Sequence, residues 1–265
     1  MALSTRALNY LAKAEFKKSI TDEKEIQAAF ERKGIKATSE LIRFQKQYGG
    51  FTYYVWREPI VFGILHPEKC RGDFRGCENE LLIEEDEDTS KKHYTCADTL
   101  YQESFTITEN GNYYEGCYNL TCLSFETQIE SHSMYDFMDK DGQYKNVYSY
   151  VEPDASDSTQ HFEQIIKAFS DKFKTFHKEF NLTAIDGHWD EIQSWHEFND
   201  FLVSKSNIGI DIFSKKIVTK EQTDIWDNMF KDDDYDSICN KYKNEALLGP
   251  FVKDGDRWVP QSEKN

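Results

Sequence analysis

The sequence contains no long hydrophobic run, and its first residues do not form the apolar core of a secretory signal peptide. A membrane-spanning helix needs about 20 mainly apolar residues, and a signal peptide needs an apolar core of roughly 7–15 residues. We therefore expect a cytoplasmic protein with no membrane span. In that compartment the six cysteines are expected to be reduced thiols rather than disulfides.

Positive charge is also scarce, because 32 Lys and Arg residues stand against 48 Asp and Glu residues, giving a formal net charge of −16. Proteins bind nucleic-acid backbones by displacing counterions with Lys and Arg, and an acidic surface opposes this. The acidic excess occurs in both halves of the chain. We expect no direct nucleic-acid binding, and the charge instead favours a basic protein as partner.

Hydrolase and cofactor-binding motifs are missing. The sequence has no G-x-S-x-G, no H-E-x-x-H, no P-loop and no G-x-G-x-x-G. His188 lies close to Asp190 and Glu191, but carboxylates at a helix start more often serve capping and the helix dipole than catalysis. The sequence therefore predicts no enzyme activity and no catalytic residue. A hydrolase that uses His188 with the nearby carboxylates is the last of three functional alternatives.

A set of cysteines and histidines invites comparison with a zinc site. Structural zinc is usually held by two closely spaced ligand pairs, whereas only His93 and Cys96 have tight spacing here. Buried free thiols are the favoured interpretation, and we expect neither a metal nor a cofactor. The set comprises His66, Cys70, Cys77, His93, Cys96, Cys117 and Cys122.

The pattern of apolar residues predicts an α+β fold in the first half of the chain. Asp22 and Glu25 form a capping box that predicts a helix start, and Ser39 is the expected cap of a second helix. After residue 51 the apolar runs become short and β-branched or aromatic, which is typical of strands. Asn110-Gly111 favours positive φ at both turn positions and predicts a β-hairpin. A helix is then expected from Ser124 to the Asp141-Gly142 region.

The second half of the chain is expected to be mainly helical. Residues 142–160 are polar and resemble a linker. Beyond them, apolar residues recur at helical spacing over 162–180, 189–202 and 225–230. The predicted domains are therefore an α+β domain over residues 1–150 and a helical extension or second small domain over residues 151–265.

Two acidic runs are the candidate partner-binding residues. A charge run is usually a solvated loop, and the functional alternative is a docking patch that attracts a basic protein by electrostatic steering. The first run is Glu84, Glu85, Asp86, Glu87 and Asp88, and the second is Asp232, Asp233, Asp234 and Asp236.

Three segments of the N-terminal half resemble the SUKH superfamily. A helix there ends in Phe44-Gln-Lys-Gln-Tyr48-Gly49-Gly50, and the hairpin reads Ile107-Thr-Glu-Asn110-Gly111-Asn-Tyr113. The following helix begins Ser124-Phe-Glu-Thr-Gln-Ile129-Glu130. The resemblance covers roughly residues 20–140, and it does not account for the Cys-rich stretch 66–96 or for the tail after residue 160.

The resemblance implies a curved, mainly antiparallel sheet flanked by helices and a binding role rather than catalysis. The superfamily includes bacterial immunity proteins, which occlude a cognate toxin that is often a basic nuclease, and fungal glucan-synthesis regulators. An immunity protein against a basic toxin is therefore the leading hypothesis. A regulatory or scaffolding protein with an endogenous partner is the second.

Overall fold

The fold of this computed structural model is α+β, as the sequence predicts. All strand pairings among the described residues are antiparallel. The chain forms two compact units, a first unit of Met1–Thr219 and a second of Lys220–Asn265, which are described separately. The structure describes residues 3–55, 58–68, 75–86, 90–99, 105–116, 119–151, 159–230, 251–254 and 257–260.

The first unit begins with three helices whose ends follow from local capping chemistry. The carboxylate of Asp22 accepts hydrogen bonds from the backbone N–H groups of Lys24 and Glu25, which confirms the predicted cap. The second predicted helix is capped by Thr38 rather than by the predicted Ser39, because the Thr38 hydroxyl accepts from the backbone N–H of Leu41. The helices are α1 (Thr5–Leu11), α2 (Glu23–Arg32) and α3 (Ser39–Tyr48).

Two antiparallel sheets are formed mainly by strands that follow α3 in the chain. The predicted Asn110-Gly111 hairpin is confirmed, since it joins β7 and β8 with Ile107 opposite Tyr113. Of the two turn positions expected at positive φ, Gly111 has a φ of +86°, whereas Asn110 is not at positive φ. The four-stranded sheet has the order β1 (Glu15–Phe16), β2 (Phe51–Val55), β3 (Glu58–Phe62), β6 (Ala97–Asp98). The five-stranded sheet has the order β4 (Ile83–Glu85), β5 (Lys92–Thr95), β7 (Phe105–Thr108), β8 (Tyr113–Glu115), β9 (Asn119–Cys122).

Aromatic side chains fill the core between these helices and sheets. The ring of Phe125 is central, with centroids 4.7 Å from Phe62, 4.8 Å from Tyr48 and 5.0 Å from Phe44. These rings come from a strand and from α3, so one residue ties several elements together. Each buried ring removes a large apolar area from water, which compensates for the modest hydrophobic fraction of the sequence.

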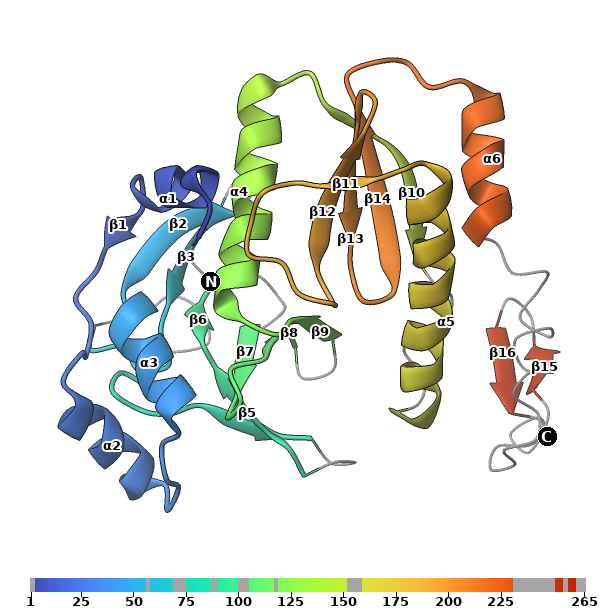
Figure 1. The fold of residues 1–265 in the computed structure, drawn as a ribbon. Helices are drawn as coiled ribbons and strands as arrows, with labels where there is room; N and C mark the ends of the chain where they lie inside the picture. The colour runs from blue at the N-terminus through green and yellow to red at the C-terminus, as the bar shows by residue number, and fades with distance from the viewer. Residues whose placement is uncertain are drawn as a thin grey trace. The chain divides into compact units, whose positions relative to one another are not determined.

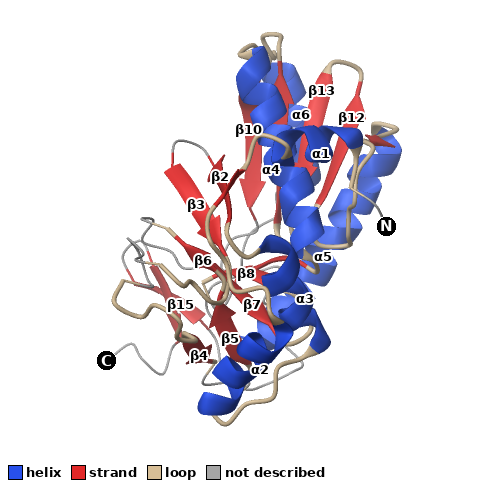
Figure 2. Cartoon of the chain, turned by 90° about the vertical axis from the view of Figure 1, so that its left-hand side faces the viewer, coloured by secondary structure: helices blue, strands red, loops and turns tan. Residues whose placement is uncertain are grey.

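Helix α4 (Phe125–Asp141) is the central element of the first unit. The helix extends from Ser124 to the Asp141-Gly142 region, as predicted; Ser124 is its N-cap, and Gly142 ends it in the left-handed conformation. Its first turns are buried on all sides, since every residue from Thr127 to Met134 is buried. The helix lies between the two sheets described above and a third sheet, so both of its sides are covered (Figures 1 and 2).

The third sheet lies between α4 and helix α5 (Thr159–Glu179) (Figure 1). Trp195 packs towards α4, with its ring 5.3 Å from Tyr135. Phe198 belongs to the opposite face, 6.1 Å from Phe176 of α5. The strand order is β10 (Lys145–Val151), β14 (Gly209–Ser214), β13 (Phe201–Lys205), β12 (Ser194–Phe198), β11 (Thr183–Ala184).

The predicted helix over residues 189–202 is wrong, because this segment forms the β12–β13 hairpin. A two-residue turn joins the strands, with Asn199 at a φ of +50° and Phe198 opposite Phe201. Both faces of the sheet are covered, so Trp195 and Phe198 are buried although they belong to opposite faces. Burial on both faces hides the alternating pattern of a strand, and the remaining apolar spacing imitates a helix.

The predicted linker and domain boundary also differ from the structure. Residues 145–151 form β10, which pairs with β14, so the first compact unit continues to Thr219 rather than ending at residue 150. Two of the three predicted C-terminal helices are confirmed, as α5 and as α6 (Lys220–Phe230). The second unit also contains a two-stranded pairing of β15 (Phe251–Asp254) with β16 (Arg257–Pro260). In the described residues, no helix is both long and apolar enough for a membrane crossing.

A polar cluster lies inside the first unit at His132 of α4. The side-chain amide of Gln128 donates to Nε2 of His132 over 2.7 Å, and Nδ1 lies 3.0 Å from the Tyr53 hydroxyl oxygen. This arrangement places the imidazole hydrogen on Nδ1, from which it donates to Tyr53. Burial lowers the pKa of His132 to about 3, because a charged imidazole is poorly solvated in the core.

The depressed pKa of His132 predicts acid destabilisation. The unfolded chain binds a proton below about pH 6.5, whereas the folded chain does not until about pH 3. The contribution is therefore fully present above pH 6.5 and is lost as the pH falls. Between pH 7 and 5.5 this group is expected to cost about 1 kcal/mol of unfolding free energy. Urea unfolding of His132→Gln should show a pH dependence smaller by that amount, and an unchanged pH dependence would contradict the assignment.

Candidate partner-binding surface

The first acidic run begins on an edge strand. Glu84 and Glu85 belong to β4, which stands at the end of its sheet and pairs with β5 in the described residues (Figure 2). Neighbouring residues of a strand point to opposite faces, yet both glutamates are exposed. The β4 edge therefore presents carboxylates on both faces of the sheet.

Asp86 differs from the two glutamates, because it is only 7% exposed. Its backbone N–H donates to the carbonyl of Lys91, and its own carbonyl accepts from the N–H of Ser90. Asp86 thus closes the base of the β4–β5 turn, and its inclusion among surface carboxylates is corrected. The remaining predicted residues, Glu87, Asp88, Asp232, Asp233, Asp234 and Asp236, lie outside the described residues.

The strand next to β4 is anchored to the rest of its sheet by polar and cation–π contacts. The Lys91 ammonium lies 4.8 Å from the Tyr114 ring centroid and donates to the Tyr114 hydroxyl. Within β5, Nδ1 of His93 lies 3.1 Å from the hydroxyl oxygen of Thr106 in β7. These contacts give the acidic strand a fixed support, which lowers the entropy that a partner must remove on binding.

The cysteine and histidine set does not assemble into a metal centre among the described residues, where no group of three or more His, Cys, Asp or Glu side chains is placed to hold an ion. Burial raises the pKa of the Cys96 and Cys122 thiols well above the usual value, so both are inert in their protonated form. Burial also lowers the pKa of His93 and His66. Cys70 and Cys117 lie outside the described residues.

His188 lies in the loop between β11 and β12 rather than at a helix start. The neighbouring carboxylate of Asp190 accepts three backbone hydrogen bonds, from Ile192 and Gln193 at 2.8 Å and from Leu123 at 2.7 Å. Asp190 therefore shapes the loop and joins it to the start of α4. This engagement leaves the carboxylate poorly suited to activate His188 as a general base.

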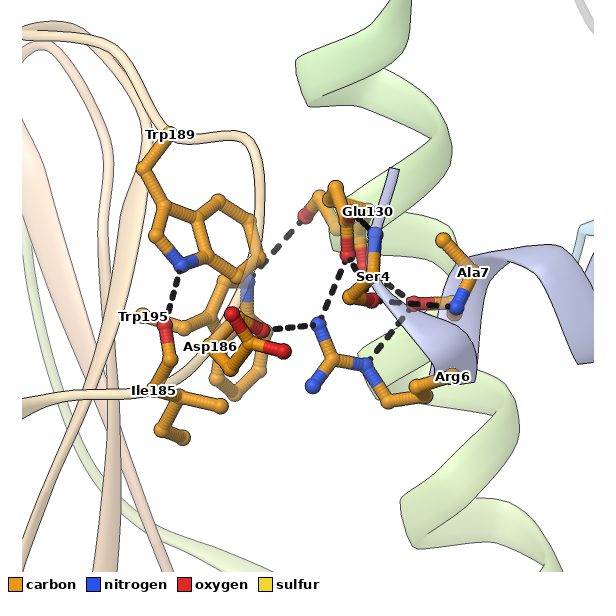
Figure 3. A network of polar contacts seen from close by, with 10 residues as sticks. Ser4, Arg6, Ala7, Glu130, Ile185, Asp186, Trp189 and Trp195 are labelled. Carbon is orange, nitrogen blue, oxygen red and sulfur yellow. Dashed lines mark hydrogen bonds and ion pairs between the residues drawn. The ribbon is translucent and has the colours of Figure 1, made fainter. Parts of the chain in front are cut away.

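A buried ion pair between Arg6 and Glu130, which no sequence motif indicates, contacts the same loop between β11 and β12 (Figure 3). Glu130 of α4 is fully buried, and its carboxylate accepts from the Ser4 N–H at 2.6 Å and the Ser4 hydroxyl at 2.7 Å. The Arg6 guanidinium donates to the same carboxylate at 2.8 Å. Glu130 lies in the Ser124–Glu130 motif, but its partners are more than 120 residues away, so no local pattern indicates them.

Arg6 extends this network to the loop before β12. It donates to the Asp186 carbonyl at 3.1 Å, and its guanidinium lies 5.8 Å from the centroid of the Trp189 ring. Burial lowers the pKa of Arg6, and the Glu130 carboxylate opposes that shift. The Trp189 indole N–H donates to the Ile185 carbonyl (Figure 3). The network thus joins α1, α4 and the loop, and its role is structural.

Comparison with known proteins gives no match to a family model, to a curated protein or to a solved structure.

Proposed function

We propose that this protein is an immunity-type protein that binds a basic protein toxin, a nuclease being the favoured class, and neutralises it by occlusion in the cytoplasm. The observation that carries the proposal is the acidic edge strand β4, on which Glu84 and Glu85 are both exposed. The net charge of −16 supports the same partner chemistry over longer range. The resemblance of residues 20–140 to the SUKH superfamily adds a binding role.

An edge strand suits this role for two physical reasons. Its outer side can pair with a strand of a partner, which supplies main-chain hydrogen bonds and a defined register. Carboxylates along it attract a basic partner and accelerate association, while they repel acidic strands of other proteins. A nuclease that is covered in this way loses access to its own substrate, so occlusion needs no chemistry from the inhibitor.

The proposal is tested by capture followed by neutralisation. Immobilised full-length protein is incubated with lysate of its source cells across a salt series, and the bound protein is purified and assayed for toxicity. A basic, near-stoichiometric partner that salt weakens and whose toxicity one equivalent of the protein abolishes is the expected result. A non-toxic endogenous partner would indicate a regulatory or scaffolding protein instead.

Neutralising the edge strand should weaken this complex. The variant Glu84→Gln/Glu85→Gln is expected to bind the captured toxin about tenfold more weakly, mainly through slower association, because electrostatic steering is reduced. Association and dissociation rates measured by surface plasmon resonance at two salt concentrations report this directly.

A matched control carries the same change in net charge at distant positions. Glu179 of α5 and Glu197 of β12 are exposed, and both elements lie on the other side of α4 from β5, the strand paired with β4 (Figure 1), so Glu179→Gln/Glu197→Gln removes two charges without altering β4. If both double variants bind equally well, the effect belongs to net charge and β4 is not the contact.

A further inference from the structure

Two imidazoles meet where helix α5 covers its sheet. His177 of α5 and His196 of β12 lie with ring centroids 5.3 Å apart and planes at 90°. Aromatic rings surround this pair, since Phe173 lies 5.4 Å from His196 and Phe180 lies 5.2 Å from Phe198. Elsewhere in the same helix-to-sheet contact, Lys172 of α5 donates to the Tyr150 hydroxyl of β10 over 3.3 Å. An ionisable pair is therefore surrounded by aromatic rings where α5 packs on its sheet, two elements that Figure 1 shows side by side.

His196 is placed so that it tolerates only the neutral form. The residue is 8% exposed, and its Nε2 lies 3.0 Å from the Ser194 hydroxyl. Its Nδ1 is buried and has no hydrogen-bond partner. In the tautomer that donates from Nε2 to the Ser194 hydroxyl, Nδ1 carries no hydrogen and its lone pair needs no donor. An imidazolium carries hydrogens on both nitrogens, so protonation of this tautomer would create a buried Nδ1–H donor without an acceptor.

The charged groups that act on His196 also oppose protonation. Burial lowers its pKa to about 4, and His177 and Lys205 contribute in the same direction. Lys205 belongs to the neighbouring strand β13, where its ammonium is buried and donates to the carbonyls of Glu191 and Ile192. On the other side of β12, the strand β11 places Ala184 opposite His196. Protonation would thus add a positive charge near the Lys205 ammonium.

We propose that α5 is a pH-sensitive strap, which leaves its sheet when His196 is protonated while the remainder of the first unit stays folded. Release separates His177 from His196 and exposes His196 to water. The α4 face of the same sheet keeps its own contacts, with Trp195 and Leu202 packed against Met134 and Met138. The strap can therefore open without dismantling the other layer.

The direction of the pH effect follows from proton linkage. With α5 docked, the pKa of His196 is about 4, whereas a solvent-exposed imidazole titrates near 6.5. Docking is therefore unaffected above about pH 6.5 and weakens as the pH falls below it. The equilibrium constant for release should rise about tenfold per pH unit below about pH 6, to roughly 150-fold at pH 4, with a limit of roughly 300-fold at lower pH.

His132 provides the internal comparison. It is also buried and neutral, but it lies within α4, between Gln128 of the same helix and Tyr53 of β2. No single helix can move away to expose it, so its protonation acts on global unfolding. The two histidines predict different spatial patterns of acid destabilisation, one confined to α5 and one general.

Hydrogen exchange on the full-length protein tests the strap. Protection factors, corrected for intrinsic exchange rates, are measured for amides of α5 and of α3 at pH 7, 6.5, 6 and 5. Relative to α3, protection of α5 should change by less than about twofold down to pH 6.5 and fall about 15-fold between pH 6.5 and 5. The variant His196→Phe removes the titrating group and should reduce that loss to under threefold. The matched variant His132→Gln should leave it unchanged.

Either of two outcomes would overturn the proposal. In the first, amides of α5 and α3 lose protection in parallel, which means that α5 opens only with the whole unit. In the second, His196→Phe retains the full pH-dependent loss. Should His196→Phe fail to fold, His196→Gln replaces it, because a neutral amide can still bond to the Ser194 hydroxyl, and the same two criteria apply.

Discussion

Replacing Arg6 by methionine is expected to lower the free energy of unfolding by about 3–5 kcal/mol. Arg6 is the cationic partner of Glu130, whose carboxylate is fully buried. Methionine keeps much of the apolar stem but removes the charge, so the Glu130 anion is left with only the two donors of Ser4. Breaking a buried pair in this way is costly, because the remaining charge cannot return to water. Urea unfolding at pH 7 measures the change as a lower midpoint at constant slope.

Two controls separate the buried charge from a general loss of a cation. Lys174 forms an exposed ion pair with Asp171, so Lys174→Met should change stability by no more than about 0.5 kcal/mol. The double variant Arg6→Met/Glu130→Gln should recover most of the loss, since a neutral amide can still accept from Ser4. If the double variant is as unstable as Arg6→Met, the cost lies in lost packing against Trp189 rather than in an uncompensated charge.

The network of Arg6 and Glu130 also explains how the two layers of the first unit are joined. Arg6 lies on α1, Glu130 on α4, and Asp186 in the loop before β12. A single guanidinium therefore fixes the register between an N-terminal helix and a sheet that is formed much later in the chain. Polar contacts of this kind contribute orientation rather than net stability.

Local signals account for the parts of the fold that the sequence predicts well. The cap at Asp22, the hairpin at Asn110-Gly111 and the helix end near Gly142 each depend on a few adjacent residues, and all three are confirmed. The stripe that predicts α5 is equally local, because one face of that helix packs on a sheet and the other meets water.

The failures have a common physical origin in burial on both faces. Strands β12 and β13 are covered by α4 and α5, so Trp195 and His196 are both buried. The alternation that identifies a strand is then lost, and the turn at Asn199-Asp200 is the remaining signal. Asn199 provides the positive φ that Gly111 provides in the first hairpin, but no Gly follows Asn199, so the sequence signal for this turn is weaker.

The residues of the candidate partner-binding surface could be predicted only in part from the sequence. Charge identifies Glu84 and Glu85 as solvent-facing, but the same run contains Asp86, whose backbone closes a turn and whose side chain is buried. Nothing in five consecutive acidic residues distinguishes these roles before the β4–β5 pairing is known. Contacts such as Arg6 with Glu130 and His177 with His196 connect elements that are far apart in the chain. Local sequence patterns therefore cannot predict them.

Replacing Gln45 by leucine is expected to be about as damaging as the loss of Arg6, at about 3–5 kcal/mol of unfolding free energy. The Gln45 side chain is fully buried on α3. Its carbonyl oxygen accepts from the backbone N–H groups of Ile64 and Leu65, at 2.7 and 3.0 Å. Its amide nitrogen donates to the carbonyls of Ile20 and Leu65, each at 3.1 Å, and to the Ser19 hydroxyl at 3.2 Å.

The Gln45 amide therefore makes the hydrogen bonds to the backbone of the turn after β3 that a neighbouring strand would make in a regular sheet. Leucine has a similar volume but no polar atoms, so it leaves buried N–H and C=O groups without partners, each of which costs about 1–3 kcal/mol. Gln47→Leu, two residues further along the same helix at an exposed position, is the matched control and should change stability by less than about 0.5 kcal/mol. The free energies of unfolding of both variants are measured by thermal and urea unfolding and compared with that of the parent protein. A Gln45→Leu protein as stable as Gln47→Leu would mean that water reaches the turn and satisfies it, and that α3 does not organise this part of the fold.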